Sequence, residues 1–379
     1  MNFPECGLPL LYKDQQVPCM TDNNTTDRFT VFTEGDALYD DMVMAINAAS
    51  ESIVMESYIF EADAVGLRFI DALVQRARAG VRVRMHLDAF GSMTLAYSPE
   101  VARIRDAGIE LKWYNPLRWY TPLRFNRRNH RKLLVIDDKS VWLGGFNIHK
   151  ENSMAVTGPD RWHDTHVRID GPLATQARIY FDRLWQDHRD WSPVFIRHAD
   201  SMLVSNHNWL QRQQLRRMLA MRFHQARSRI WMCTPYFMPD HFLQRQMTRA
   251  ARRGIDVRLL LPYESDRPIT QLVARATYAS LMASGIKIFE FEPRFLHAKI
   301  IIIDDDWSTI GSSNLDYRSF FVNYEINLVS SRPDLARQLG ENLAADMARS
   351  IQITPQDITG QRWKWWLLRQ AGSLLRRIL

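Results

Sequence analysis

Short apolar runs alternate with longer helical patterns along this chain, and the same order of elements occurs twice. In the first half, the β-rich run Ser52–Phe60 precedes a helical stretch and a second strand-like run that begins at Gly80. In the second half, Arg229–Phe237 precedes a helical stretch and a strand-like run that begins at Gly254. Self-similarity on this scale indicates a duplicated unit, and the alternation of strands with helices indicates βαβ elements.

Two further runs, Leu133–Ile136 and Ile300–Ile303, are wholly apolar. Continuous apolar runs are typical of parallel strands buried on both faces, so we expect each unit to be an α/β sandwich. The predicted organisation is an N-terminal extension (1–27), a first unit (28–190), a linker (191–205), a second unit (206–350) and a basic amphipathic C-terminal tail (351–379).

The composition is that of a folded protein with a large core. The chain has 379 residues and is 46% hydrophobic, which suits one large or two ordinary domains and excludes intrinsic disorder. The apolar runs are much shorter than the ~18 to 20 residues of a membrane-spanning helix, so no such helix is expected. The N-terminal residues include an acid and do not resemble a secretory signal. Three cysteines without C-x-x-C spacing give no disulfide scaffold and no zinc signature, which favours a reducing cytoplasm.

The charge balance suggests a class of partner. Lysine and arginine number 49 against 42 acidic residues, a formal net charge of +7, and the pI is about 9.4. This excess favours a polyanion or an anionic membrane as partner. A soluble basic enzyme would have the same composition, so charge alone leaves both interpretations open.

Each unit contains one copy of a motif with the spacing H-x-K-x4-D. The copies are His130, Lys132 and Asp137 in the first unit, and His297, Lys299 and Asp304 in the second. In both units an asparagine, Asn147 or Asn314, follows the histidine by 17 residues. One H-x-K sequence would carry no weight, but two copies with matched continuations indicate a shared site.

Strand geometry says which motif residues act together. Residues i and i+2 of a strand point to one face, so His130 and Lys132 can address the same group. Asp137 and Asp304 have the opposite parity and should face away, so we expect these two motif residues to be structural. A lone histidine beside an apolar strand is usually a core residue, but buried unpaired lysines are costly. Two His-Lys pairs therefore predict one site on a pseudo-twofold axis.

Each histidine needs a carboxylate to fix its tautomer. Asp164 in the first unit and Glu325 in the second each stand at the head of an apolar segment and are the candidates. The asparagines Asn147 and Asn314 are expected to contact a phosphate, although capping the turns after Gly144 and Gly311 would explain their presence too.

The duplicated motif with its following asparagine resembles the signature of the phospholipase D superfamily, over about residues 28–350. Within it, the chain is most similar to bacterial cardiolipin synthases that lack transmembrane helices. The closer match is carried by Tyr58–Phe60, Asp88, Asn129–Lys132, Asp164–Arg168, Thr234–Phe237 and Gly311–Ser319. In one departure, Gly145 stands where the second unit has Ser312, so only the second unit offers a hydroxyl to phosphate there.

The resemblance implies an α/β fold of two pseudo-twofold-related phospholipase D-like α/β/α sandwich domains with the active site at their interface. It implies phosphodiester exchange through a covalent phosphohistidine, with no cofactor and no metal. His130 would be the nucleophile and His297 the general acid, although the two copies are too symmetric for sequence to decide between them. The phosphate would be held by Lys132, Lys299, Asn147, Asn314 and Ser312.

The expected reaction joins two phosphatidylglycerol molecules into cardiolipin and releases glycerol. Hydrolysis of phospholipid to phosphatidic acid is the alternative within the same chemistry, and a phospholipase D-like nuclease is a third interpretation. The chain itself does not identify the donor and acceptor lipids or the oligomeric state.

Two basic segments favour lipid over nucleic acid. In 362–379 an arginine-rich helical face lies opposite a Trp/Leu face with no acid, which describes a helix in an anionic membrane interface. The insertion 117–129 combines four arginines with three aromatic residues. The tail could instead pack on the protein core, and the insertion could stack nucleobases. We expect peripheral binding to a phosphatidylglycerol-containing surface, on the cytoplasmic side of the bacterial inner membrane, through Trp119, Arg124, Trp363, Trp366, Arg369 and Arg376.

Overall fold

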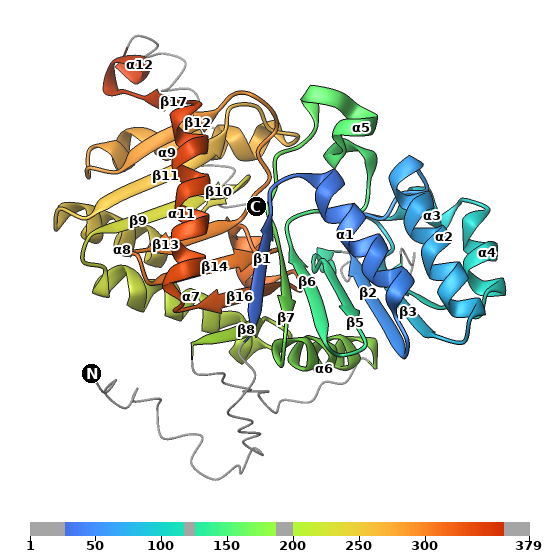
Figure 1. The fold of residues 1–379 in the computed structure, drawn as a ribbon. Coiled ribbons are helices and arrows are strands. Elements are labelled where there is room, and N and C mark those ends of the chain that lie inside the picture. Colours follow the sequence, from blue (N-terminus) through green and yellow to red (C-terminus); the bar gives the residue numbers. More distant parts are fainter. Residues whose placement is uncertain (1–26, 117–125, 187–199, 360–379) are drawn as a thin grey trace.

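The computed structural model describes residues 27–116, 126–186 and 200–359. They form two α/β domains that lie side by side, the first in blue and green and the second in yellow to red (Figure 1). The predicted membrane contacts Trp119, Arg124, Trp363, Trp366, Arg369 and Arg376 lie outside the described residues. Within those residues, no helix has both the length and the hydropathy that crossing a bilayer requires.

The first domain is built on a seven-stranded sheet in the order β1-β7-β6-β5-β2-β3-β4. Its strands are β1 (Arg28–Phe32), β2 (Ser52–Ser57), β3 (Arg82–Asp88), β4 (Glu110–Tyr114), β5 (Leu133–Ile136), β6 (Ser140–Gly144) and β7 (His166–Asp170). The helices are α1 (Gly35–Ala48), α2 (Ala64–Arg78), α3 (Met93–Ala96), α4 (Glu100–Asp106), α5 (Met154–Thr157) and α6 (Leu173–Trp185).

The second domain repeats this plan with an eight-stranded sheet in the order β17-β12-β11-β9-β13-β14-β16-β8. Its strands are β8 (Ser201–Ser205), β9 (Arg229–Cys233), β11 (Asp256–Pro262), β12 (Lys287–Phe291), β13 (Ile300–Ile303), β14 (Trp307–Gly311), β16 (Ile326–Ser330) and β17 (Ser350–Ile353), with the short pair β10 (Phe237–Met238) and β15 (Leu315–Asp316) beside it. The helices are α7 (Trp209–Gln225), α8 (His241–Arg252), α9 (Pro268–Met282), α10 (Tyr317–Phe321), α11 (Pro333–Ala348) and α12 (Pro355–Thr359).

The duplicated α/β fold is confirmed, but the direction expected for the two apolar strands is wrong. β5 runs antiparallel to both β2 and β6, and β13 runs antiparallel to both β9 and β14. Both strands are buried along their whole length. A continuous apolar run reports burial on two faces, and helices cover both faces of these mixed sheets, so the run does not fix strand direction.

The sheets also extend beyond two of the predicted boundaries. Ser201–Ser205, assigned to the linker, forms β8 and pairs with β16. Strand β17 (Ser350–Ile353) pairs with β12 and runs from the last residue of the predicted second unit into the predicted tail. The second domain as folded therefore includes residues on both sides of 206–350.

One hydrophobic cluster joins the two domains. It contains Val141 and Val167 of the first sheet together with Ile302 of the second sheet and Leu339 of α11, and each of these side chains is fully buried. Burial of this apolar surface stabilises the contact between the domains. This contact fixes the position of the strand ends next to the motif histidine of one domain relative to those of the other domain.

Candidate active site

A cavity of about 610 Å³, open solvent at its mouth included, lies between the two domains. The loops at one end of the central strands of each sheet supply its walls. Because β5 runs antiparallel to β2, the segment before β5 meets the segment after β2 at the same end of the sheet, and the same holds for β13 and β9. The lining residues are Tyr58, Ile59, Arg128, His130, Asn147, Trp162, Tyr236, Asp266, Arg267, His297, Asn314, Asp316, Arg318 and Asn323.

Both motif histidines face this cavity, and each is held by a carboxylate of the other domain. Nδ1 of His130 lies 3.1 Å from both carboxylate oxygens of Glu325. Nδ1 of His297 lies 2.5 Å from Oδ2 of Asp164. A carboxylate on Nδ1 fixes the tautomer and leaves Nε2 for the reacting group. The sequence identified both carboxylates, and the structure shows that the pairing crosses the domain interface.

Backbone contacts hold each pair in register. The amide of His130 donates to the carbonyl of Tyr324 at 2.9 Å, and the amide of His297 donates to the carbonyl of His163 at 2.7 Å. Tyr324 immediately precedes Glu325, and His163 immediately precedes Asp164. The same backbone contact that joins the domains therefore brings each histidine to its carboxylate.

The two motif lysines lie behind the histidines. Lys132 and Lys299 are only 2% and 4% exposed, and neither is among the residues that line the cavity. Nζ of Lys132 donates to the carbonyl of His130 at 2.9 Å. Nζ of Lys299 lies 2.9 Å from Nδ1 of His297 and 3.8 Å from Asp164. In this geometry the lysines place positive charge beneath the site, and their direct contact with phosphate stays a prediction.

Burial dominates the electrostatics of these groups. Burial lowers the pKa of His130 to about 4. The charge of Lys132 also lowers this pKa, whereas the carboxylate of Glu325 raises it. Burial lowers the pKa of His297 to about 3, again with the neighbouring lysine, Lys299, acting in the same direction. Burial lowers the pKa of Lys132 to about 7. At neutral pH both imidazoles are therefore uncharged before substrate binds, which suits a nucleophile.

These shifts predict a bell-shaped dependence of the initial rate on pH. The acidic limb is expected near pH 4, where His130 gains a proton and can no longer attack. The alkaline limb is expected to begin near pH 7, where Lys132 loses its positive charge. The anionic phosphodiester would raise the pKa of His297 on binding, so that residue can be protonated in the complex. Initial rates on one soluble phosphodiester between pH 3.5 and 9 test this, and a flat profile from pH 6 to 9 would contradict it.

The two predicted phosphate-binding asparagines line the cavity from opposite domains. Asn147 follows β6, and its Oδ1 accepts the backbone amide of Ile59 at 3.2 Å. Asn314 follows β14, and its backbone amide donates to the hydroxyl of Ser319 at 3.0 Å. Their placement agrees with contact to a shared phosphate, which stays a prediction.

Ser312 does not face the cavity, contrary to the prediction that it contacts phosphate. Its side chain is fully buried, and its hydroxyl donates to Oε2 of Glu325 at 2.5 Å. At the equivalent position, a Cβ on Gly145 would lie 2.0 Å from Oδ1 of Asp164. The shorter carboxylate of Asp164 occupies the space that the serine takes in the other half, so the departure between the copies reflects two ways of supporting a carboxylate.

The motif aspartates lie away from the cavity, as their parity indicates. Asp137 accepts the backbone amides of residues 50–52, at 2.8 to 2.9 Å. Asp304 accepts the amides of residues 227–229 in the same way. These hydrogen bonds tie the turns after β5 and β13 to the start of the neighbouring strand. Asp137 and Asp304 support the fold of the motif and do not contact the reacting atoms in this geometry.

Several cavity residues have no counterpart in the sequence-based prediction of the site. The ring of Tyr58 lies 5.0 Å from that of His130, and the ring of Trp162 lies 5.2 Å from that of His297. Asp266 and Arg267 come from the loop between β11 and α9, which shows no duplicated pattern. Tyr58 belongs to a segment that resembles cardiolipin synthases and could have been assigned, whereas nothing in the sequence placed Asp266 and Arg267 at the site.

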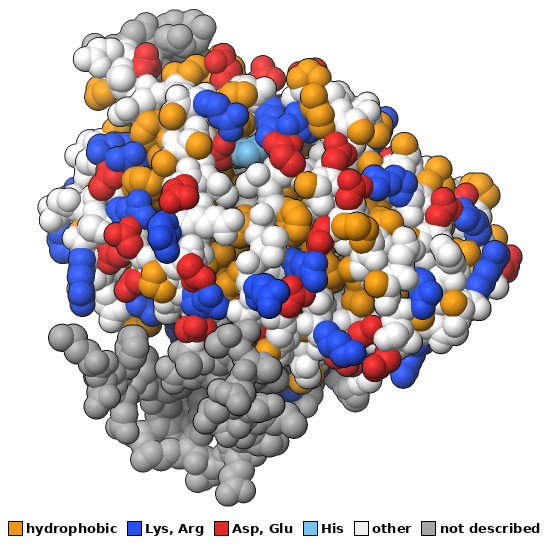
Figure 2. Space-filling model, in the orientation of Figure 1, with side chains coloured by type: hydrophobic (Ala, Val, Ile, Leu, Met, Phe, Trp, Pro, Cys, Tyr) orange, Lys and Arg blue, Asp and Glu red, His pale blue; other side chains and the backbone are white. Residues whose placement is uncertain are grey.

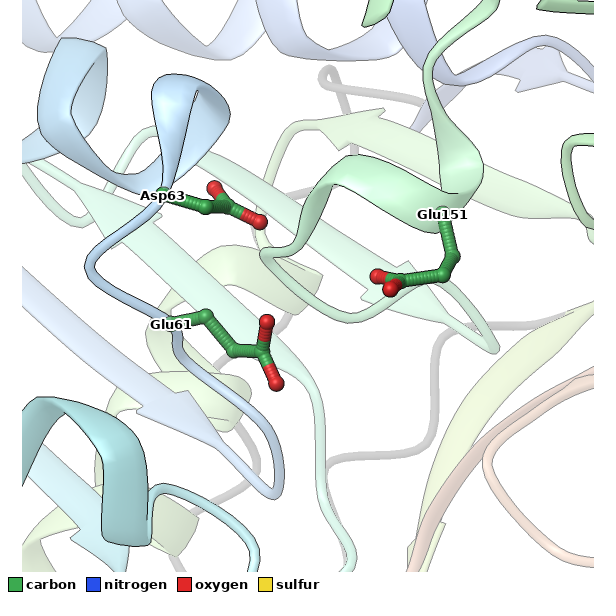
Figure 3. Close-up of side chains that lie close together, drawn as sticks. All are labelled: Glu61, Asp63 and Glu151. Atoms are coloured by element: carbon green, nitrogen blue, oxygen red, sulfur yellow. The ribbon is translucent and has the colours of Figure 1, made fainter. Parts of the chain in front are cut away.

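A separate group of carboxylates lies outside this cavity. Within the described residues, Glu61, Asp63 and Glu151 bring ligand oxygens within 4.8 Å of one another (Figure 3). Asp63 caps α2 and accepts the backbone amide of Lys150 at 2.6 Å, and Glu151 lies 2.5 Å from Nδ1 of His149. No pattern in the sequence indicates this cluster, because its members meet only through the fold. Two of the three carboxylates already serve as structural hydrogen-bond acceptors.

Activity is expected to survive an excess of EDTA. Within the described residues, the His, Cys, Asp and Glu side chains spaced to hold a metal ion are Glu61, Asp63 and Glu151, which lie outside the cavity. The buried Lys132 and Lys299 behind the histidines would supply the positive charge that a phosphate requires. Rates before and after chelation, followed by addition of Mg²⁺, Ca²⁺, Mn²⁺ or Zn²⁺ singly, provide the measurement. A loss of turnover that one divalent ion restores would show that the site depends on metal.

Comparison with known proteins places the chain in a family. The family described as "Cardiolipin synthase, PLD-like domain" matches residues 42–185 and 219–347. Cardiolipin synthase A of Pseudomonas aeruginosa is 30% identical, with 98% of this chain and 76% of that protein covered. A probable cardiolipin synthase of Bacillus subtilis is 29% identical, with 88% of this chain and 68% of that protein covered.

The fold has a solved relative of the same size. A phosphatidylserine synthase of Haemophilus influenzae superposes with a TM-score of 0.69 at 14% identity, covering 93% of this chain and 95% of that chain. At this identity the likeness concerns the fold alone. The two matched segments each contain one motif histidine of the cavity, and the chain belongs to the family of cardiolipin synthases with phospholipase D-like domains.

Proposed function

We propose that this protein is a phosphatidyltransferase that makes cardiolipin from two phosphatidylglycerol molecules and releases glycerol. The observation that carries the proposal is the pair of histidines, His130 and His297, which face one cavity while a carboxylate of the opposite domain holds each Nδ1. This arrangement provides one nucleophile and one acid for a single phosphorus atom. Membership of the cardiolipin synthase family supports a phospholipid as the phosphodiester.

The geometry supports a two-step exchange. In the first step Nε2 of His130 attacks phosphorus, the bond to the glycerol oxygen breaks, and His297 gives that oxygen its proton. In the second step the neutral His297 takes the proton of an acceptor hydroxyl, whose oxygen attacks phosphorus and displaces His130. Lys132, Lys299 and the asparagines would offset charge on the non-bridging oxygens. The assignment of His130 as the nucleophile is part of the proposal, because the two half-sites are built alike.

Product analysis tests the proposal directly. Purified protein incubated with phosphatidylglycerol vesicles should yield cardiolipin and free glycerol in equal amounts, as measured by mass spectrometry. Phosphatidic acid as the sole product would favour the alternative, a phospholipase D that transfers the phosphatidyl group to water. Cleavage of single-stranded DNA without any change in lipid would replace the lipid proposal with the nuclease interpretation.

The surroundings of the cavity support a lipid substrate. Tyr317 adjoins lining residues in the sequence and is 52% exposed, and Phe90, which lies beside Arg128 of the cavity wall, is 43% exposed. Apolar side chains beside a phosphodiester site suit a substrate whose headgroup carries acyl chains. On the face drawn in Figure 2, basic and acidic side chains are interspersed. That face does not offer the continuous basic stripe that a nucleic acid would follow.

We further propose that the protein binds the cytoplasmic side of the bacterial inner membrane as a peripheral protein. Its basic tail and the insertion 117–129 would contact anionic headgroups, in addition to the apolar residues beside the cavity. Each tail cation near an anionic surface is worth about 1 kcal/mol, and insertion of Trp and Leu side chains adds to that.

Deleting residues 362–379 is expected to weaken binding to anionic vesicles much more than it slows turnover of a short-chain soluble substrate. The deletion removes five cations, which are Arg362, Lys364, Arg369, Arg376 and Arg377. High salt should reproduce only part of the loss, because it screens charge but leaves apolar insertion in place. Co-sedimentation of both forms at low and high salt measures this. Equal sedimentation of both would assign the membrane contact to 117–129 or to the residues beside the cavity.

A further inference from the structure

Three arginines line the cavity, and their immediate surroundings differ. Arg128 is buried and lies 3.3 Å from Oδ1 of Asp88. Arg318 donates to the backbone carbonyl of Asn126 at 2.7 Å. Arg267 has a half-exposed side chain, and its shortest ion-pair distance is 4.0 Å, to Asp266. Arg318 is thus held by oxygen atoms of Asn126, whereas Arg267 has an exposed guanidinium whose carboxylate neighbour, Asp266, lies 4.0 Å away.

The carboxylate of Asp266 is itself engaged elsewhere. Both of its oxygens accept the hydroxyl of Tyr236, at 2.8 and 2.9 Å. Its charge therefore offsets part of the charge of Arg267 without forming the parallel two-bond contact that arginine makes with a carboxylate or a phosphate. The planar fork of the guanidinium remains suited to a second oxyanion.

Arg267 is placed between the two halves of the catalytic centre. Its positive charge acts on the hydroxyl of Tyr58, whose ring lies 5.0 Å from that of His130. It also lies 5.5 Å from the ring centroid of Tyr236, and that ring lies 6.4 Å from the ring of His297. An anion bound by Arg267 would therefore sit close to both histidines without displacing the phosphate between them.

The proposed reaction requires such a second anion site. After the first step the donor phosphate is bonded to His130, and the motif lysines and asparagines serve that phosphate. The acceptor, phosphatidylglycerol, carries its own negative phosphate three carbon atoms from the hydroxyl that attacks. Water and free glycerol, which can also accept the phosphatidyl group, carry no phosphate. A cation that binds the acceptor phosphate would therefore favour phospholipid over these neutral acceptors.

We propose that Arg267 binds the phosphate of the acceptor phospholipid and thereby sets the choice of cardiolipin synthesis over hydrolysis. This inference rests on the proposed transferase function and concerns the second step only. Arg267 is a specificity-determining residue in this scheme. The helix α9 begins at the next residue, Pro268, so its positive N-terminal end adds to the local attraction for an anion.

The test compares acceptors in Arg267→Gln. Full-length protein in mixed micelles containing phosphatidylglycerol and labelled glycerol forms three measurable products, namely cardiolipin, phosphatidic acid and labelled phosphatidylglycerol. Losing a charge-assisted contact should lower the rate of cardiolipin formation by roughly 10- to 100-fold. Hydrolysis and glycerol exchange should stay within about threefold, because donor attack does not involve Arg267. Arg267→Lys keeps the charge but not the planar fork of the guanidinium. Its rate of cardiolipin formation should lie between those of wild type and Arg267→Gln.

The matched control is Arg252→Gln, which removes one positive charge from an exposed position on α8. It should leave all three products unchanged, so a general effect of net charge is distinguished from a local one. If Arg267→Gln lowers all three products equally, or leaves the ratio of cardiolipin to phosphatidic acid unchanged, the proposal for Arg267 is wrong while the transferase function stands. If the wild-type protein forms no cardiolipin, the proposed function itself fails, and the role of Arg267 fails with it.

Discussion

His130→Ala and His297→Ala are each expected to lower phosphatidylglycerol turnover by roughly 10⁴-fold or more, with the fold unchanged. The nucleophile and the acid act as one unit, so removing either should cost nearly as much as removing both. Both side chains line the cavity, and neither belongs to the hydrophobic cluster that joins the domains. Lipid product measured by mass spectrometry gives the rate, and thermal unfolding checks that the fold persists.

A substrate with a good leaving group separates the roles of the two histidines. A nitrophenyl phosphodiester releases nitrophenolate, a weakly basic phenoxide that needs little protonation, so His297→Ala should still release one equivalent of nitrophenolate and accumulate phosphohistidine. His130→Ala should give neither. His224→Ala, at an exposed position near the end of α7, serves as the control and should match wild type. Near-normal lipid turnover in His297→Ala would refute the two-histidine mechanism. Release of one equivalent by His130→Ala but not by His297→Ala would show that His297 is the nucleophile and His130 the acid.

Glu325→Gln is expected to lower kcat by roughly 10² to 10⁴-fold with little change in KM. Glu325 accepts from Nδ1 of His130 across the domain interface, and Ser312 and Ser319 donate to its two oxygens. Glutamine keeps the shape but presents an amide nitrogen to one of these donors, which disturbs the tautomer and the orientation of His130. A comparable substitution of the carboxylate in serine proteases costs about 10⁴-fold.

The control for this substitution is Glu341→Gln, at an exposed position on α11. It removes one carboxylate of the same type and should have no effect on kcat or on stability. Asp164→Asn should act on His297 as Glu325→Gln acts on His130, because the two half-sites are crossed alike. If Glu325→Gln raises KM and leaves kcat unchanged, Glu325 serves binding and does not orient the nucleophile.

The sequence located the two histidines of the cavity because the motif that contains each of them is short. The repeated spacing of the motif located His130 and His297, and the structure brings both histidines to one cavity. The motif histidines and lysines precede β5 and β13, and the lysines lie behind the histidines, so the expectation from strand geometry that each pair addresses one group stays a prediction. The parity argument for Asp137 and Asp304 rests on the same local geometry and agrees with their bonds to backbone amides. The resemblance to cardiolipin synthases, and with it the α/β fold, is confirmed by the family match.

Contacts between distant segments decided the rest. The crossed pairing of His130 with Glu325 spans 195 residues, and no local pattern indicates which carboxylate serves which histidine. Ser312 and Gly145 occupy equivalent positions in the two halves. Whether the Ser312 hydroxyl contacts a phosphate or Glu325 depends on where the carboxylate of Glu325 packs, which the sequence does not show. Arg267 comes from a loop without a repeat.

By itself, the sequence determined the duplicated unit, the two histidines that meet in the cavity and the family, because these depend on the spacing of short motifs that recur in the chain. The tertiary structure decided which residues of the two halves meet, the direction of the apolar strands and the charge surrounding each cavity arginine. Those features arise from packing between segments far apart in the chain, where burial and hydrogen bonding select one arrangement among many that the same local patterns allow.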